Sequence, residues 1–468
     1  MKRSGFAAAA TLAAMLAFGV SGALAASQPG SPLAKVAAHD GVSVPPALAH
    51  AIKQRLAAAP AAAAANAGQA SGRQQELSAS DGMPLDLFGL TVALSGDGHT
   101  ALVGAPGRTV GAAYVFVEHG SKWTEQQEID SPAGPSEDTY GYSVSLSADG
   151  STALVGAPTG GSNQAGIVYS YARQGGTYVL NGQMTPSDGA FSDEFGVSVS
   201  VSALGNVALV GAPIHNGYQG AAYVFVHGTR SWSQQREFVN PGVAGSAYGI
   251  SVSEAPDGLA GVVGAPLGND VQGAAYVVSE LTGSQQELVA SDASEGAFFG
   301  VTASMNALGT RVLVGSPTAN LGDGAAYVFD NAKGGWTQSQ ELVQSNPGCC
   351  DQFGYAVALN YLGNVALIGS PGRNGTDGSA YTFAGYPTLT QQRELDNPVA
   401  GSEGEYGFSV AVDALGDQLL IGAPYQNNAQ GAAWAAPNYP IRRRRWPGYD
   451  SGKRPGTHGR DGARAAGR

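Results

Sequence analysis

The chain has 468 residues, a formal net charge of −12 and two cysteines, Cys349 and Cys350. Neighbouring cysteines cannot form a long-range disulfide within the chain, and a chain of this length buries a core without such cross-links. Residues 73–436 carry −23, because residues 1–72 carry +4 and residues 437–468 carry +7. An acidic body repels nucleic acid and anionic membranes, so neither partner is expected for it.

The N-terminus has the three-part layout of a secretory signal peptide. Lys2 and Arg3 precede an apolar run over residues 6–20, and small residues lead to a cleavage site that we place after residue 25. This run is too short to hold a bilayer span, and no later stretch approaches the roughly 20 apolar residues needed. We therefore predict signal peptide 1–25, no membrane insertion, and a location in the periplasm, at the cell surface or in the medium. Residues 26–72 are rich in Ala and Pro and predict a linker.

From residue 73 onward an aromatic-Gly pair recurs seven times, with a period of 51 to 55 residues. The pairs are Phe88-Gly89, Tyr140-Gly141, Phe195-Gly196, Tyr248-Gly249, Phe299-Gly300, Phe353-Gly354 and Tyr406-Gly407. Self-similarity at a fixed period of this length predicts a repeat architecture.

Each unit predicts four strands in the same order. After the aromatic-Gly pair comes an alternating strand such as 142–147, which ends in a type I turn with Gly at its last position, as at 147–150. A wholly apolar second strand such as 153–155 ends in Gly-Ala-Pro or Gly-Ser-Pro. A variable loop leads to a third strand, such as 220–225, and then to a polar fourth strand, such as 234–238, that suits an exposed edge. No helix is expected between these strands.

The offset of the first and last strands predicts ring closure. Residues 74–77 look like a fourth strand but precede the first unit, whereas the seventh unit ends after Trp434 without a fourth strand. Pairing of residues 74–77 with the seventh unit removes two open strand edges. A solenoid or tandem sandwiches would not require this offset. We therefore predict an all-β, seven-bladed β-propeller of four-stranded antiparallel blades over 73–436, followed by a basic, disordered tail over 437–468.

The aromatic-Gly pair at the start of strand one and Gly-Ala-Pro at the end of strand two resemble the FG-GAP repeat. That repeat forms the seven-bladed head of integrin alpha chains and occurs in exported bacterial proteins. The resemblance covers residues 73–436 and implies adhesion or extracellular recognition through one face of the propeller.

In integrins the hairpin between strands one and two often holds calcium through several spaced Asp or Asn residues, and this sequence departs from that pattern. Calcium takes six to eight oxygen ligands. The hairpins here offer at most one or two acids, so we expect simple turns, with no calcium, other metal or cofactor. These acids are Asp97, Asp149, Asp257, and Asp413 with Asp417.

No converging set of catalytic groups stands out in the sequence, and we predict a protein that is not an enzyme. Cys349-Cys350 has no His nearby in the sequence, so a pair without a role or a strained vicinal disulfide is favoured over a nucleophile. The loop histidines have no metal-ligand spacing and are interpreted as solvated: His99, His119, His215 and His227.

The antiparallel strand order predicts that the loops after strands two and four share one rim. The loops after strand two vary most and can hydrogen-bond a glycan or peptide. Their candidate binding residues are His215, Asn216, Tyr218, Gln219, Asn269, Asp270, Asn320, Asp323, Arg373, Asn374, Tyr425, Gln426 and Asn427. The loops after strand four carry acids that form either a solvated rim or a site for a cation or basic partner: Asp86, Glu137, Asp138, Asp193, Glu194, Glu295, Asp351, Glu403 and Glu405. On the other rim, Trp123, Trp232 and Trp336 are interpreted as anchors of the outer strands.

These features favour an exported, monomeric binding or adhesion module that recognises a protein or glycan through this rim. One alternative is a structural surface protein without a specific ligand. A glycan array would distinguish it from the binding or adhesion module. A second alternative, a hydrolase or lyase acting on a polysaccharide, is addressed by activity screening. The basic tail either docks on an acidic surface or has no function.

Overall fold

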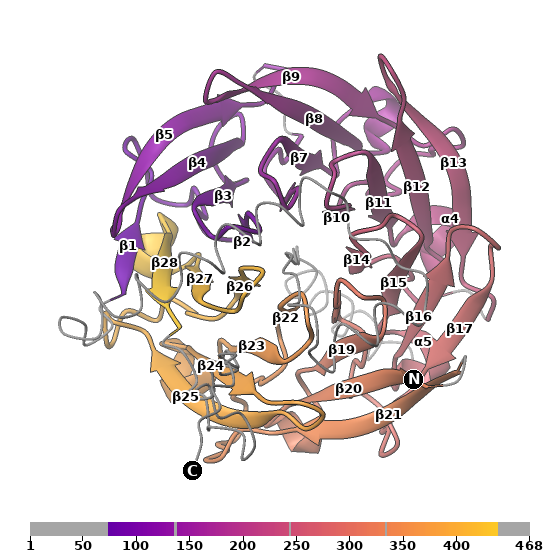
Figure 1. Ribbon diagram of the computed structural model, residues 1–468, viewed down its shortest axis with the longest axis vertical. Helices are drawn as coiled ribbons and strands as arrows, with labels where there is room; N and C mark the ends of the chain where they lie inside the picture. The colour runs from indigo at the N-terminus through magenta and orange to yellow at the C-terminus, as the bar shows by residue number, and fades with distance from the viewer. Residues whose placement is uncertain (1–73, 135–137, 243–244, 333–334, 439–468) are drawn as a thin grey trace, which may run out of the picture. The chain divides into compact units, whose positions relative to one another are not determined.

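The computed structural model describes residues 74–134, 138–242, 245–332 and 335–438. They form seven four-stranded antiparallel sheets, arranged as blades around a central axis (Figure 1), and this confirms the predicted propeller. The predicted signal peptide, the linker and, beyond Asn438, the basic tail lie outside the described residues. In the described ranges, no helix has the length and apolar character that crossing a membrane requires.

In blades 1 to 6 the four strands follow one another in the chain, from strand one near the axis to strand four at the outside (Figure 1). Blade 1 comprises β2 (Thr91–Leu94), β3 (Thr100–Ala105), β4 (Ala112–His119) and β5 (Lys122–Asp130). Blade 2 comprises β6 (Ser143–Leu146), β7 (Thr152–Ala157), β8 (Ile167–Gln174) and β9 (Thr177–Met184). Blade 3 comprises β10 (Ser198–Val201), β11 (Val207–Ala212), β12 (Ala221–His227) and β13 (Trp232–Val239).

The remaining blades repeat this order. Blade 4 comprises β14 (Val252–Glu254), β15 (Ala260–Ala265), β16 (Ala274–Ser279) and β17 (Gln285–Leu288). Blade 5 comprises β18 (Thr302–Met305), β19 (Arg311–Ser316), β20 (Ala325–Ala332) and β21 (Gly335–Leu342). Blade 6 comprises β22 (Val357–Leu359), β23 (Val365–Ser370), β24 (Ser379–Ala384) and β25 (Thr390–Asp396). Blade 7 comprises β26 (Ser409–Val412), β27 (Gln418–Ala423), β28 (Ala432–Pro437) and, from the start of the chain, β1 (Gln75–Leu77).

Closure of the ring follows the predicted offset. Strand β1 pairs antiparallel with β28, with Glu76 opposite Trp434, and Leu77 is buried in the core. The Gln75 side chain continues the link into blade 1, because its amide donates to the Trp123 carbonyl at 2.8 Å and its oxygen accepts from the Trp123 amide at 2.9 Å. Polar fourth strands thus do more than form an exposed edge, because their Gln side chains join neighbouring blades.

Glycines of the two repeat motifs form the contact between neighbouring blades. A Cβ on Gly211, in the Gly-Ala-Pro motif of blade 3, would lie 1.8 Å from the carbonyl oxygen of Gly249 in blade 4. Gly249 itself has a φ of +97°, which L side chains rarely adopt. The preceding aromatic residue, Tyr248, is buried and forms a parallel bridge with Gly220 of blade 3. The repeat sequence therefore encodes how one blade packs on the next.

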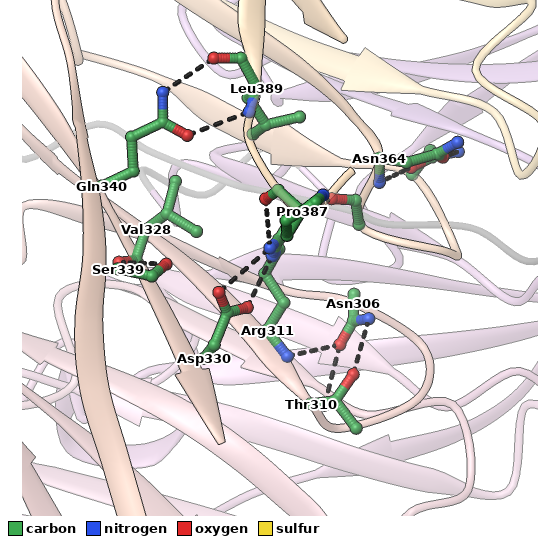
Figure 2. Close-up of polar contacts among 12 residues, drawn as sticks. Asn306, Thr310, Arg311, Val328, Asp330, Ser339, Gln340, Asn364, Pro387 and Leu389 are labelled. Carbon is green, nitrogen blue, oxygen red and sulfur yellow. Dashed lines mark hydrogen bonds and ion pairs between the residues drawn. The ribbon is translucent and has the colours of Figure 1, made fainter. Parts of the chain in front are cut away.

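A buried arginine joins blades 5 and 6 (Figure 2). Arg311, in β19, pairs with Asp330 of β20 through Nε at 2.7 Å and Nη2 at 3.0 Å. The same guanidinium donates to the carbonyl oxygens of Gly363, at 2.8 Å, and Pro387, at 2.7 Å, both in blade 6. Nε, Nη1 and Nη2 of the guanidinium thus all donate hydrogen bonds, as burial of a charge requires.

The hairpins between strands one and two are tight turns, as predicted. In blade 2 the Gly150 amide donates to the Ser147 carbonyl at 2.9 Å, which closes the predicted turn. The Asp149 carboxylate accepts hydrogen bonds from the Ser147 hydroxyl, at 2.7 Å, and from the Ser151 amide, at 2.9 Å. The acid of this hairpin therefore stabilises the turn itself.

The expectation that no helix lies between the strands is wrong in detail. Single helical turns follow strand two in several blades, although residues inside them have left-handed dihedrals, such as Asn216 with a φ of 50°. Asn, Asp and Gly tolerate this conformation, so the polar loops fold as compact turns. The α-helical turns are α4 (His215–Tyr218), α5 (Gly268–Val271), α6 (Arg373–Thr376) and α7 (Gln426–Ala429), and the 3₁₀ turns are η1 (Ser162–Gln164) and η2 (Asn320–Gly322).

Candidate functional site

The loops after strands two and four contact each other through backbone hydrogen bonds, and we call the surface that they form the loop rim. Leu87, in the loop before blade 1, donates its amide to the Ala429 carbonyl of blade 7 at 2.9 Å. Tyr218, after strand two of blade 3, accepts at its carbonyl from the amides of Gly245 and Ala247 at 3.1 and 3.0 Å. The loops between strands one and two and between strands three and four form the opposite, hairpin rim, as the bond from the Glu118 amide to the His99 carbonyl illustrates.

The candidate binding residues from the sequence divide by exposure. His215 and Gln426 are buried, so they do not present their side chains to a large ligand, and the interpretation of His215 as a solvated histidine is wrong. Half-buried side chains are those of Gln219, Asp323 and Arg373. Exposed candidates on the loop rim are Asn216, Tyr218, Asn269, Asp270, Asn320, Asn374, Tyr425 and Asn427.

Several exposed Asn residues on the loop rim also shape their own loops. Asn216, Asn374 and Asn427 have φ values of 50°, 55° and 55°, in the left-handed region. The Asn269 amide donates to Glu287 Oε1 at 2.9 Å, on the fourth strand of its own blade. These residues therefore have a structural task beside any part in binding.

Large apolar side chains on the loop rim are exposed as well. Leu321, in η2, is 98% exposed, and Phe191, before blade 3, is 71% exposed. They are the two most exposed large apolar residues among those that the structure describes, and both lie on this rim. Single exposed apolar side chains are normal on protein surfaces, and on this rim they offer a partner apolar area to bury.

An aromatic cluster marks the propeller axis at the loop rim. The residues that directly follow the aromatic-Gly pairs pack against residues of other blades, and in blades 2, 6 and 7 they are Tyr142, Tyr355 and Phe408. The ring of Phe408 lies 4.9 Å from that of Tyr355 and 5.9 Å from that of Tyr425, measured between centroids. Tyr425 is partly exposed, so the cluster reaches the surface at the axis.

Two carboxyl groups adjoin this axial cluster. Burial raises the pKa of Glu405 to about 7 and raises the pKa of Glu194 above its ordinary value. The charge of Glu405 interacts with the phenols of Tyr355 and Tyr425, and that of Glu194 with the phenol of Tyr142. Tyr355 and Phe408 are buried, whereas the Tyr425 ring is partly exposed and can stack on a sugar or a flat side chain. The two half-buried carboxyls can hold a cationic group.

Sequence reasoning identified the acids of this rim and Tyr425 but missed the other members of the axial cluster. Tyr142, Tyr355 and Phe408 each follow an aromatic-Gly pair directly, and an alignment of the seven units at that position would have grouped them. On the hairpin rim, Trp123 and Trp232 are buried and Trp336 packs partly buried against the core, in agreement with their interpretation as anchors. Cys349 and Cys350 are exposed free thiols.

Blades 1, 3 and 6 each have a group of acidic side chains on the loop rim around one basic residue, and we call this group the acidic cradle. In blade 1 the cradle consists of Asp81, Glu128 and the hydroxyl of Tyr114, and Arg108 fills it with ion pairs to both acids. In blade 6 Arg373 pairs with Asp351, at 3.0 Å, and with Glu394, at 3.3 Å. Asp351 lies two residues before its aromatic-Gly pair, where blade 3 has Asp193. The predicted binding residue Arg373 is thus an internal counter-charge. His215 occupies the corresponding position in blade 3.

Comparison with known proteins supports the assignment of the repeat. The profile of the FG-GAP repeat family matches residues 72–116, 123–171, 178–225, 282–329 and 336–383, which together make up about half of the chain. A search among curated proteins found no match. The propeller is a fold often used in ligand binding, although fold alone does not specify the ligand. Seven ordered copies of both motifs, the closed ring and these matches together show that the chain belongs to the FG-GAP repeat family.

Proposed function

We propose that this protein is an exported, monomeric binding or adhesion module that recognises a protein or glycan through its loop rim. The three-part N-terminal sequence supports export. The loop rim supports recognition, because it combines variable polar loops with exposed apolar side chains such as Leu321 and Phe191. No catalytic role is proposed.

The exposed edge of the axial cluster carries this proposal furthest. A ligand bound there also reaches the loops that surround the axis. Tyr425 offers a partly exposed ring. Glu405 offers a carboxyl, and burial raises the pKa of this carboxyl to about 7.

The proposal is tested with the purified protein on a glycan array and on an array of extracellular proteins, followed by biolayer interferometry with each ligand found. The loop-rim variant Leu321→Ser/Tyr425→Ala is compared with the hairpin-rim variant Leu204→Ser/Leu259→Ser, whose leucines are 47% and 42% exposed. We expect the first variant to weaken binding by about tenfold or more and the second to bind as the parent does. Loss of binding in the second variant alone would assign recognition to the other face. Absence of any ligand on both arrays would favour a structural surface protein.

A further inference from the structure

Blade 3 differs from the blades that carry Arg in the acidic cradle. His215, at the start of α4 near the outer strands (Figure 1), has a side chain only 5% exposed and lies among three carboxylates. Its Nδ1 lies 2.8 Å from Asp193 Oδ2, and its Nε2 lies 3.6 Å from Asp188 Oδ2 and 3.8 Å from Glu237 Oε1. These two longer distances exceed hydrogen-bond length.

The contact with Asp193 fixes the orientation of the imidazole. An ionised carboxylate only accepts hydrogen bonds. Nδ1 therefore carries a hydrogen and donates a hydrogen bond to Asp193. In the neutral imidazole, the lone pair of Nε2 then points towards Asp188 and Glu237. A lone pair facing two carboxylates is unfavourable, so either a proton on Nε2 or a bound cation belongs between them.

Blades 1 and 6 show how the fold supplies that charge elsewhere. Arg108 and Arg373 stand two residues after the Pro of their Gly-Ala-Pro or Gly-Ser-Pro motif, as His215 does. The Arg108 guanidinium pairs with Asp81 and Glu128, the counterparts of Asp188 and Glu237, whereas the shorter imidazole stops 3.6 and 3.8 Å from those two acids.

The donor atoms fit a small transition-metal ion. In the described part of the chain, Asp188, His215 and Glu237 form the one group of three such residues whose ligand atoms all lie within 4.8 Å of one another. Ligand atoms of tetrahedral Zn²⁺ lie about 3.4 Å apart, so a small shift of the two exposed acids would complete the site. One imidazole nitrogen and two carboxylate oxygens suit Zn²⁺, whereas Ca²⁺ takes six to eight oxygens.

Supporting residues around the cluster match those of known metal sites. Metal-bound imidazoles usually donate their other N–H to a carboxylate, and Asp193 takes that position here. The Tyr223 hydroxyl donates to Asp188 Oδ1 at 3.1 Å and so orients Asp188 Oδ2 towards the imidazole. Asp193 is itself held by the Ala190 amide at 2.7 Å.

We propose that blade 3 binds one Zn²⁺ ion through His215 Nε2, Asp188 and Glu237, with water as the fourth ligand. The site joins three segments: the loop before blade 3, the turn after its second strand, and its outer strand. The ion stabilises the part of the loop rim that carries Tyr218 and Phe191. This inference is independent of the ligand that the rim recognises.

The test uses the full mature protein, freed of metal with EDTA and then dialysed. Zn²⁺, Mn²⁺ and Ca²⁺ are titrated separately by isothermal calorimetry, and bound metal is counted by mass spectrometry after gel filtration. The variants are His215→Arg, which copies the blade 1 cradle, and Glu237→Gln, which keeps the shape of the side chain. His119→Ala, at an exposed histidine, is the matched control.

We expect one Zn²⁺ per chain for the parent and for His119→Ala, and an affinity for Zn²⁺ reduced by about 100-fold or more in both cradle variants. Zn²⁺ should raise the melting temperature of the parent but not that of His215→Arg, which circular dichroism should show to be folded. Unchanged Zn²⁺ binding in His215→Arg, no binding by the parent, or Ca²⁺ binding as tight as Zn²⁺ binding would each overturn the proposal. If Glu237→Gln alone failed to fold, His215→Arg would still decide it.

Discussion

Removal of the closing strand should destabilise the whole ring. A chain that starts at Asp81 lacks β1 and therefore loses the burial of Leu77, about 2–3 kcal/mol. It also loses the ladder to β28 and the two hydrogen bonds between Gln75 and Trp123, each worth about 1 kcal/mol. The total is about 5 kcal/mol. For a propeller of about 360 residues this corresponds to a fall in melting temperature of roughly 6 °C.

The assay compares the melting temperature of this truncated chain with that of a chain that starts at Gly72. A synthetic peptide of residues 72–80, added to the truncated chain, should restore most of the loss by pairing with the free edge of β28. A peptide of the same composition in scrambled order should not. Equal melting temperatures for the two chains, or equal rescue by both peptides, would refute closure as a source of stability.

Three further predictions concern single residues. Asp330→Ala should lower the free energy of unfolding by about 3 kcal/mol in urea titrations, because it leaves the buried charge of Arg311 without its carboxylate. A carboxyl whose pKa rises on folding binds its proton more tightly in the folded state, so the stability that Glu405 contributes falls as the pH rises from about 4.5 to about 7. The melting temperature of Glu405→Gln should therefore be higher than that of the parent at pH 8 and equal to it near pH 4. Gly211→Ala should cost about 3 kcal/mol in urea titrations, because its Cβ would strike the next blade, whereas Gly217→Ala, with open space around it, should cost about 1 kcal/mol.

Each of these predictions has a contrary outcome. If Arg311→Met/Asp330→Ala is less stable than Asp330→Ala, the unpaired charge is not the source of the loss. A difference between Glu405→Gln and the parent that does not change between pH 4 and pH 8 would contradict the raised pKa. Equal losses for Gly211→Ala and Gly217→Ala would show that contact between blades does not explain the repeated glycine.

Much of the fold could be predicted because the features that determine it recur along the chain. Strand order, hairpin turns and closure were evident from the aromatic-Gly pairs, the Gly-Ala-Pro motifs and the unmatched segment 74–77. The links that Gln side chains form between blades could not be predicted from these repeated motifs. A link such as Gln75 to Trp123 joins strands of different blades, and only the packed ring shows which backbone each amide meets.

The candidate sites were harder to predict, because their members come from different units. Asp188, His215 and Glu237 lie in three separate segments, and the sequence gives no spacing that marks them as one cluster. Tyr142, at the axis, approaches Tyr355 only because the ring is closed. Exposure of a loop was likewise no guide to exposure of each side chain, since the compact turn α4 buries His215 while it leaves Asn216 in solvent.

The pairing of the first strand with the last also constrains when the protein can fold. Side chains of Glu76 and Gln426, in the two ends of the ring, meet across 350 positions of sequence. A ribosome or a translocation channel delivers the chain from its N-terminus, so β1 emerges first and has no partner until blade 7 arrives. Early blades can form as local four-stranded sheets, but the ring cannot be completed on a partly delivered chain. Chaperones that shield strand edges would therefore be needed most by the first segment to appear.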